Sequence, residues 1–385
     1  MMREMAIFVY LHCFKIIFNI CKLFPLQKKV VFIVSYGENI LYMYEEMKRQ
    51  QIADKIVVLY KHTCKYDFNQ CNVKKYFFES FSIYDTILSI YHLATARNIL
   101  LDNYFGSLSA VEFKQEVQCV QLWHAAGAIK KFGIEMPLVK KRSQKAQERF
   151  LKVYQKFHKI VVGSESLAEI YKQAFCLTEK NIVRTGIPRT DLFFQRDRQQ
   201  EIILKLRKTN RKIGEKKVIL YAPTFREHEL INIHIELDIQ ALYENLRDEY
   251  ILLIRLHPAV KGRLDILGKY HEFIYDYSDY PDVNDLLIVT DILITDYSSI
   301  PFEFSLLRRP MIFFPYDLGV YKKERNFWFE YESFVPGKIA YDVDEIIYYI
   351  KKGEFDLEKI EDFSKKWNQY SKGDASKQLV KHLFM

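Results

Sequence analysis

The chain has 385 residues, which exceeds one hydrophobic core of ordinary size and predicts two domains. A hydrophobic share of 49%, with 15% aromatic residues, excludes an intrinsically disordered protein. The 57 Lys and Arg residues against 49 Asp and Glu residues leave a formal net charge of +8, which suits an anionic partner without naming nucleic acid, lipid headgroups or a phosphorylated substrate.

The six cysteines are scattered, with no Cys-x-x-Cys pair and no Cys/His cluster at zinc spacing. We therefore predict neither a disulfide framework nor a metal site, and we expect no cofactor. A reducing cytoplasm fits this cysteine usage. The N-terminal apolar segment contains Lys15 and Lys22 and lacks a small-residue cleavage site, so no cleavable signal peptide is expected.

Residues 5–24 are almost wholly apolar, and their few polar residues recur at helical spacing on one narrow face: His12, Lys15, Asn19 and Lys22. A membrane-spanning helix is not expected, because each lysine costs about 2.5–3.5 kcal/mol near the bilayer centre. Two alternatives remain: a helix in the plane of the headgroups, or a helix whose apolar face packs on its own domain. We predict that residues 1–26 form an amphipathic segment at the membrane interface.

Strand-like and helix-like segments then alternate. The expected strands are residues 30–34, 56–60, 73–78, 99–101 and 117–123, with helices at residues 40–49 and 83–96 and further strand–turn units at 159–166 and 182–191. This alternation predicts a parallel sheet with crossover helices, an N-terminal doubly wound α/β domain over residues 27–198.

The strand at 117–123 runs directly into His124, which is followed by small residues. Ligands bind α/β sheets at the carboxyl ends of the strands. A lone histidine is more often structural, but the position of His124 favours a functional role.

A dense run of basic residues follows: Lys130, Lys131, Lys140, Lys141, Arg142, Lys145, Arg149, Lys152, Lys156 and Lys159. Their spacing does not place them on one helix face, so a solvated surface is one explanation. A patch for anionic lipid is the other, at about 1 kcal/mol per basic residue close to the membrane. Because motifs that read nucleic-acid bases are missing, we expect no nucleic-acid partner.

The polar stretch 195–215 indicates the connection between domains, and the alternation restarts over residues 199–385. Strands are expected at 218–222, 250–256, 273–275, 291–295 and 311–315, with a helix at 285–289. Three of these strand ends carry polar side chains, namely Thr224 and Arg226, Arg255 and His257, and Ser298, Ser299 and Glu303. Parallel strands share one edge for their carboxyl ends, so these groups are expected to converge.

The stretch 295–303 predicts a strand, a tight polar turn and a helix over residues 304–309. Ser298 or Ser299 can cap this helix, and Pro301 suits its first turn. Unpaired backbone N–H groups and the positive end of the helix dipole then favour a diphosphate. Glu303 lies where a carboxylate can accept hydrogen bonds from ribose hydroxyls. An ordinary capped helix after a strand explains the stretch equally well.

Two α/β domains, one with a histidine at its edge and the other with a nucleotide-like constellation, predict two Rossmann-like doubly wound domains facing a cleft, the GT-B architecture. No Gly-x-Gly-x-x-Gly turn and no Walker lysine loop occurs, which argues against a dehydrogenase and a P-loop ATPase.

Five motifs in order resemble the CDP-glycerol glycerophosphotransferases of wall teichoic acid synthesis: WHAAGAIKKFG (123–133), GIPRTD (186–191), YAPTFRE (221–227), RLHP (255–258) and LITDYSSIPFEFSLLRRPMIFFPYDL (293–318). The first motif resembles that of the primases, which add the first glycerol phosphate to a lipid-linked disaccharide, whereas polymerases typically carry His-Gly-Thr-Pro. Phe225, Glu227 and Pro301 depart from the usual pattern.

The resemblance implies a role for each matched residue. His124 and His257 are the implied catalytic residues, with His124 as the base, and His257, Ser298 and Ser299 handle the diphosphate. Thr224, Arg226 and Glu303 match substrate-binding positions. An acceptor hydroxyl would attack the β-phosphorus of CDP-glycerol while His124 takes its proton, and CMP would leave.

The implied function is transfer of glycerol phosphate from CDP-glycerol to an undecaprenyl-diphosphate-linked disaccharide in teichoic acid synthesis, by an enzyme bound peripherally to the cytoplasmic face of the membrane. The N-terminal domain would bind the acceptor and the C-terminal domain the CDP-alditol. One alternative is a ribitol-phosphate or other CDP-alditol transferase or polymerase of teichoic acid or capsule synthesis. Another is a membrane-associated scaffold protein with a decayed site, against which the intact set of site residues argues.

Overall fold

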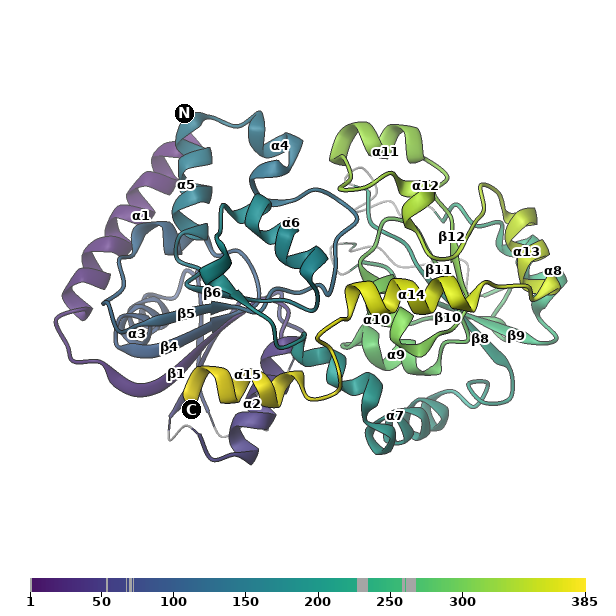
Figure 1. Cartoon of the computed structure of the whole chain (residues 1–385), viewed down its shortest axis with the longest axis horizontal. Helices are drawn as coiled ribbons and strands as arrows, with labels where there is room; N and C mark the ends of the chain where they lie inside the picture. The colour runs from purple at the N-terminus through teal and green to yellow at the C-terminus, as the bar shows by residue number, and fades with distance from the viewer. Residues whose placement is uncertain are drawn as a thin grey trace. The chain divides into compact units, whose positions relative to one another are not determined.

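The computed structural model describes residues 2–52, 55–66, 68, 71, 73–226, 235–257, 260 and 268–385, and its chain divides into two compact units (Figure 1). Unit 1 comprises residues 1–124, 132–191 and 370–385, and unit 2 comprises residues 125–131 and 192–369.

Unit 1 is built on a seven-stranded sheet in the order β3-β2-β1-β4-β5-β6-β7, in which every neighbouring pair is parallel. Its strands are β1 Gln27–Val34, β2 Ile56–Tyr60, β3 Lys74–Phe77, β4 Ala96–Leu101, β5 Gln118–Gln121, β6 Lys159–Val161 and β7 Ile182–Val183. Both faces of such a sheet are covered, so its central strands are continuous apolar runs, as residues 30–34 of β1 show by being at most 2% exposed. The predicted doubly wound sheet is confirmed.

The helices of unit 1 are α1 Met2–Cys21, α2 Glu38–Arg49, α3 Ile83–Ala94, α4 Pro137–Lys140, α5 Gln144–Tyr154, α6 Glu165–Phe175 and α15 Ala375–Phe384, with 3₁₀ turns at Gly106–Ala110, Gly133–Glu135 and Glu179–Asn181. Helix α1 packs on α3, and α15 packs on α2 (Figure 1). The Asp191 carboxylate accepts hydrogen bonds from the Ala375 and Ser376 N–H groups at 2.8 and 2.9 Å, which fixes the start of α15.

Unit 2 is built on a six-stranded sheet in the order β10-β9-β8-β11-β12-β13, again with parallel pairs throughout. Its strands are β8 Lys217–Ala222, β9 Tyr250–Ile254, β10 Ile274–Asp276, β11 Ile292–Thr295, β12 Met311–Phe313 and β13 Lys338–Ile339. One buried cluster contains side chains of β8, β9, β10, β11 and β12 together with Leu242, Leu246, Val343, Ile346, Ile347 and Ile350. The sequence expectation of a second parallel α/β sheet is confirmed.

The helices of unit 2 are α7 Arg196–Thr209, α8 Ile239–Leu246, α9 Val283–Val289, α10 Ile300–Phe304, α11 Leu318–Arg325, α12 Tyr331–Phe334, α13 Val343–Lys352 and α14 Leu357–Trp367, with a 3₁₀ turn at Ser305–Leu307. The 3₁₀ segment Pro188–Phe194 passes from unit 1 into unit 2. Several helices begin at side-chain caps, as at Asp342, whose carboxylate accepts from the Glu345 N–H at 2.9 Å.

The helix expected over residues 304–309 lies earlier in the chain than predicted. It begins at Ile300 with Pro301 in its first turn and continues as a 3₁₀ turn to Leu307. Arg308 adopts a left-handed conformation with φ of 54°, which ends the helical run before Pro310. The Pro301 placement was predicted correctly. The start of the helix was not, because residues 300–304, apolar except for Glu303, fit a buried helix as well as an extended turn.

The division into units differs from the predicted domain limits of 27–198 and 199–385. Residues 370–385 belong to unit 1, and residues 125–131 belong to unit 2. Amphipathic spacing shows that a terminal helix is buried on one face, but it does not show which sheet that face covers.

Helix α1 forms over the predicted N-terminal segment. Phe14, Phe18 and Cys21 are buried against unit 1, while most of its other apolar side chains are exposed. Over Glu4–Cys21 it is long and apolar enough to cross a membrane by length and composition alone. A single such helix near an N-terminus is weak evidence for a membrane-spanning segment.

Candidate active site

His124 follows β5 in unit 1, at a strained turn. Trp123 has φ of 57°, a left-handed conformation that bulky residues rarely adopt and that costs on the order of 1–3 kcal/mol. The surrounding structure holds it: the Trp123 N–H donates to Gln121 Oε1 at 2.8 Å, and Asn39 Nδ2 donates to the Trp123 carbonyl at 2.9 Å. This turn places His124 just beyond the carboxyl end of β5.

The imidazole of His124 has a defined orientation. Its Nδ1 lies 3.1 Å from the backbone carbonyl of Asp102. A carbonyl only accepts, so Nδ1 carries the proton and Nε2 is the basic nitrogen of the neutral ring. The ring stacks on Tyr36 and on Trp123, with centroids 4.5 Å apart in both cases.

The carboxylate of Asp102, which follows β4, organises the loop between β1 and α2. It accepts hydrogen bonds from the N–H groups of Ser35, Tyr36 and Gly37 at 2.8–2.9 Å. Burial raises its pKa to about 6, against the effect of these bonds. Sequence reasoning missed Asp102 and Tyr36, although Asp102 directly follows an expected strand, the same signal that identified His124.

In unit 2 the ends of β8 and β11 are joined through one buried carboxylate. Asp296 Oδ1 accepts from the Thr224 N–H at 2.8 Å and from the Tyr297 N–H at 2.6 Å, and Oδ2 accepts from Arg226 Nη1 at 3.0 Å. The predicted convergence of Thr224, Arg226 and the residues after β11 is therefore observed. Thr224 is 6% exposed, and its Oγ1 has no hydrogen-bond partner among the described residues.

The guanidinium of Arg226 is engaged on several sides by the protein itself. Its Nε and Nη2 donate to the two oxygens of Asp317 at 2.8 Å each, and Nη1 also donates to the Thr224 carbonyl at 2.6 Å. Tyr297 donates from its hydroxyl to Asp317 at 2.9 Å. Arg226 is 4% exposed, so the geometry gives it a structural role, and its contact with substrate stays a prediction.

The residues after β11 have different environments. Ser298 Oγ accepts from the Ile300 N–H at 3.2 Å, whereas Ser299 makes no capping bond with its side chain. Both serines are half-buried, and Glu303 in α10 is only 1% exposed. The two serines are thus more accessible to solvent than Glu303 in the described conformation.

His257 follows β9, and its ring lies 4.6 Å from that of Phe225 between centroids. The neighbouring Arg255 is buried and donates from Nη1 to the carbonyls of Leu256 and Ser278. Glu227 and Pro258 of the predicted motifs lie outside the described residues.

The segment after His124 belongs to unit 2. The Trp328 N–H donates to the Ile129 carbonyl and the Lys131 N–H to the Asn326 carbonyl, both at 3.0 Å, and Lys130 pairs with Phe327. A Cβ on Gly127 would lie 2.1 Å from the Phe302 ring, which explains the small residue there. The predicted basic run is therefore not one patch, because Lys130 is half-buried in unit 2.

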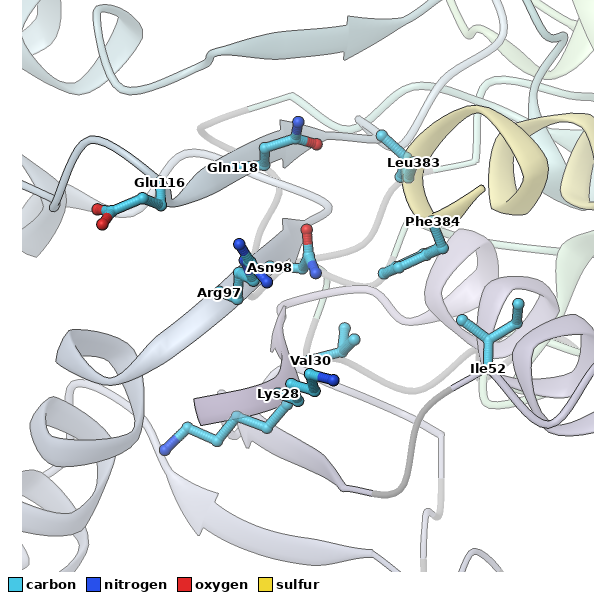
Figure 2. Close-up of a pocket in the computed structure, with 10 residues that line it drawn as sticks. Lys28, Val30, Ile52, Arg97, Asn98, Glu116, Gln118, Leu383 and Phe384 are labelled. Carbon is cyan, nitrogen blue, oxygen red and sulfur yellow. The ribbon is translucent and has the colours of Figure 1, made fainter. Parts of the chain in front are cut away.

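A cavity of about 530 Å³ lies in unit 1 at the amino-terminal ends of β1, β4 and β5, with α15 forming one wall (Figure 2). Its described lining residues include none of the predicted site residues: Lys28, Lys29, Val30, Ile52, Arg97, Asn98, Glu116, Gln118, Leu383 and Phe384. His124 follows the carboxyl end of β5, so this cavity is not part of the candidate site.

Residues 16–385 match the family of CDP-Glycerol:Poly(glycerophosphate) glycerophosphotransferases. The chain is similar to a Teichoic acid glycerol-phosphate primase of Bacillus subtilis (strain 168), with 36% identity over 92% of this chain and 91% of that protein. It is also similar to a Teichoic acid poly(ribitol-phosphate) polymerase of Bacillus spizizenii, with 33% identity over 95% of this chain and 58% of that protein.

Among solved structures, the chain resembles a variant of the Wall Teichoic Acid Polymerase TagF soaked with CDPG. The TM-score is 0.77 at 25% sequence identity, covering 93% of this chain and 88% of that one. This likeness extends over both units.

Proposed function

We propose a reaction from one premise, that the chain belongs to the CDP-glycerol:poly(glycerophosphate) glycerophosphotransferase family. The proposed reaction is transfer of glycerol phosphate from CDP-glycerol to a lipid-linked disaccharide, with release of CMP, in teichoic acid synthesis. The observation that carries it is His124, whose tautomer is set by the Asp102 carbonyl at a strained strand end. The primase relative supports the choice of acceptor.

In this reaction a hydroxyl oxygen of the acceptor bonds to the β-phosphorus of CDP-glycerol, and the bond from that phosphorus to the bridging oxygen of CMP breaks. His124 takes the hydroxyl proton at Nε2 while Nδ1–H donates to the Asp102 carbonyl. In the proposed assignment Ser298, Ser299 and His257 bind the diphosphate. Stacking on Tyr36 and Trp123 holds the imidazole in place, which removes an entropic cost from proton transfer.

The donor is tested by mixing the protein with a lipid-linked disaccharide analogue and either CDP-glycerol or CDP-ribitol, and measuring CMP. We expect CMP from CDP-glycerol at a rate at least tenfold above that from CDP-ribitol. The similarity to a ribitol-phosphate polymerase makes ribitol the alternative, and the reverse preference would establish it. CMP release from neither donor would favour a scaffold protein.

A second prediction concerns the ribose. We propose that the Glu303 carboxylate accepts hydrogen bonds from the ribose hydroxyls, in which case Glu303→Gln weakens CDP-glycerol binding by about 1.5–3 kcal/mol, the usual range for a hydrogen bond to a charged group. The same substitution should affect a 2′-deoxyribose analogue far less. Both affinities are measurable by calorimetry. Since Glu303 is 1% exposed, equal losses for the two nucleotides would assign it to the packing of α10 instead.

We also propose that unit 1 docks peripherally on the cytoplasmic face of the membrane through an apolar surface of α1 and the start of α3. Its exposed side chains are Met5, Phe8, Val9, Ile16, Ile20, Leu23, Phe24, Phe81, Ile83, Tyr84 and Ile87. Arg149 of α5 pairs with Glu4 of α1 at 2.8 Å, which places α5 next to α1 (Figure 1). Lys145 and Lys152 of α5 are exposed, as are Lys141 and Arg142 shortly before it in the chain.

Deleting α1 would remove Phe14 and Phe18 from the core, so membrane docking is tested by substituting exposed residues instead. Phe8→Ser with Phe81→Ser should lower binding to anionic vesicles by about tenfold or more, since each exposed phenylalanine gains about 1.5–3 kcal/mol on burial. Leu204→Ser, at a 57% exposed position of α7, is the matched control and should not change binding.

Charge contributes separately. Lys141→Gln with Lys145→Gln should weaken vesicle binding at low salt and little at high salt, because attraction to headgroups is screened within about 8 Å at physiological ionic strength. Sedimentation with vesicles measures both variants. If the phenylalanine variant sediments as fully as the wild type, α1 and α3 do not form the docking surface.

A further inference from the structure

Lys130 is part of unit 2 although it follows the His124 motif in sequence. Backbone bonds on both sides of it fix its place, from Trp328 to the Ile129 carbonyl and from Lys131 to the Asn326 carbonyl. Its position is therefore set by unit 2 and does not depend on the conformation of a surface loop.

The side chain of Lys130 lies among charged groups that are already paired. Asp296 is bonded to Arg226, and Asp317 binds Arg226 through both oxygens and Tyr297 through one. The Lys130 Nζ lies 5.9 Å from the centre of the Tyr321 ring, whose other cation neighbour is Arg226 at 4.7 Å. Among the described residues, Lys130 Nζ makes no hydrogen bond and no ion pair.

The carboxylate that favours the charged form of this lysine is already in use. Asp296 is paired with Arg226 at 3.0 Å, and the positive charges of Arg226 and Arg325 both disfavour a protonated Lys130. Desolvation lowers the pKa of Lys130 to about 8, with further lowering from Arg325 and Arg226 and an opposing effect of Asp296. Binding of an anionic ligand stabilises an ammonium group that is poorly solvated and has no paired anion in the protein.

A second unsatisfied group lies at the same carboxylate. The backbone of Thr224 is bonded to Asp296, its side chain is nine-tenths buried, and its Oγ1 lacks a partner among the described residues. An ammonium and a hydroxyl donor together match a phosphate, whose oxygens only accept hydrogen bonds.

We propose that Lys130 binds phosphate in unit 2, and that its ligand is the diphosphate of the nucleotide donor. This inference rests on the proposed function for the identity of the donor, but not for the chemistry of the anion. It assigns a ligand to a lysine that sequence spacing had placed in a surface run of basic residues. The neighbouring Lys131 has a different environment, with its Nζ 5.5 Å from the Trp328 ring centre.

The test compares Lys130→Met with Lys131→Met in the full chain, using CDP-glycerol and inorganic pyrophosphate as separate ligands in calorimetry. Lys130→Met is expected to weaken both ligands at least twentyfold, and Lys131→Met by less than threefold. Unfolding temperature is recorded for both variants. Lys130→Met should not lower it, because the substitution removes a charge that has no paired anion.

A pH series adds a signature that a structural role would not give. If the protonated lysine is required, the dissociation constant of the wild type for CDP-glycerol rises about tenfold from pH 7 to pH 9, because Lys130 loses its proton near pH 8. Lys130→Arg keeps its charge over this range and should show a nearly flat profile.

The outcomes separate the two proposals. Unchanged affinity in Lys130→Met, with or without a lower unfolding temperature, overturns the inference and leaves Lys130 as a support for Tyr321. Pyrophosphate binding that depends on Lys130, in a wild type that does not bind CDP-glycerol, upholds the phosphate site and overturns the choice of donor. A wild type that binds neither ligand overturns both.

Discussion

Replacement of His124 with alanine is expected to reduce CMP release by about 10²–10⁴-fold, the range typical of general-base catalysis. The loss should fall on the rate of turnover and leave the affinity for CDP-glycerol within a few-fold of wild type, because His124 belongs to unit 1 and the proposed donor residues belong to unit 2. Single-turnover assays with saturating donor, together with calorimetric binding, separate the two effects.

A matched control for this variant is His62→Ala. His62 also follows a strand of the unit 1 sheet, two residues after β2, and its ring stacks on Phe77 with centroids 4.3 Å apart. It should retain CMP release within a few-fold. If His124→Ala remains folded but loses CDP-glycerol binding to the same extent as turnover, His124 contacts the donor and is not the base.

The second large effect is expected on stability. Arg226→Met removes the partner of two carboxylates, of which Asp296 is 2% exposed, and should lower the free energy of unfolding by about 3–5 kcal/mol, the cost of leaving a buried charge uncompensated. The aromatic rings around the guanidinium, Tyr297, Tyr316 and Tyr321, lie 4.7–5.2 Å from it and would lose their packing as well. Urea denaturation measures the change.

Arg308→Ala provides the control for charge removal. Arg308 is paired with Glu361 at 2.6 Å, but its side chain is 58% exposed, and such pairs contribute about 0–1 kcal/mol. A loss below 1 kcal/mol for Arg226→Met, combined with weaker nucleotide binding, would show that Arg226 serves the ligand more than the fold.

The sequence predicted the strands of both sheets well because strands buried on two faces are continuous apolar runs. The β2 limits of residues 56–60 agree with the structure, and β8 and β11 differ from the predicted limits by one residue at one end. The alternation with helices then implies parallel pairing, so the positions of His124, Thr224 and Ser298 at strand ends followed from the pattern alone.

The environment of each strand-end residue was not predictable in the same way. The family resemblance and its place after β8 assigned Arg226 to a substrate-binding position, but its carboxylate partners lie 70 and 91 residues further along the chain. Nothing in local spacing reports such contacts. Lys130 was placed in a surface run of basic residues for the same reason. The sequence does not show that residues 125–131 pack with residues 192–369, which follow about 60 residues later.

The exchange of segments between the two units determines how this protein can be divided or recombined. The chain passes between the units at residues 124–125, 131–132, 191–192 and 369–370, so neither unit is one continuous piece of the gene. A fragment cut at residue 191 would lack the Ala375 and Ser376 N–H groups bound by Asp191, and a fragment beginning at residue 192 would lack the strip that covers Phe302 and pairs with Phe327. Under the proposed function, exchange of donor specificity between relatives therefore requires residues 125–131 to move together with 192–369. A single crossover would separate Lys130 from Asp296 and Arg226.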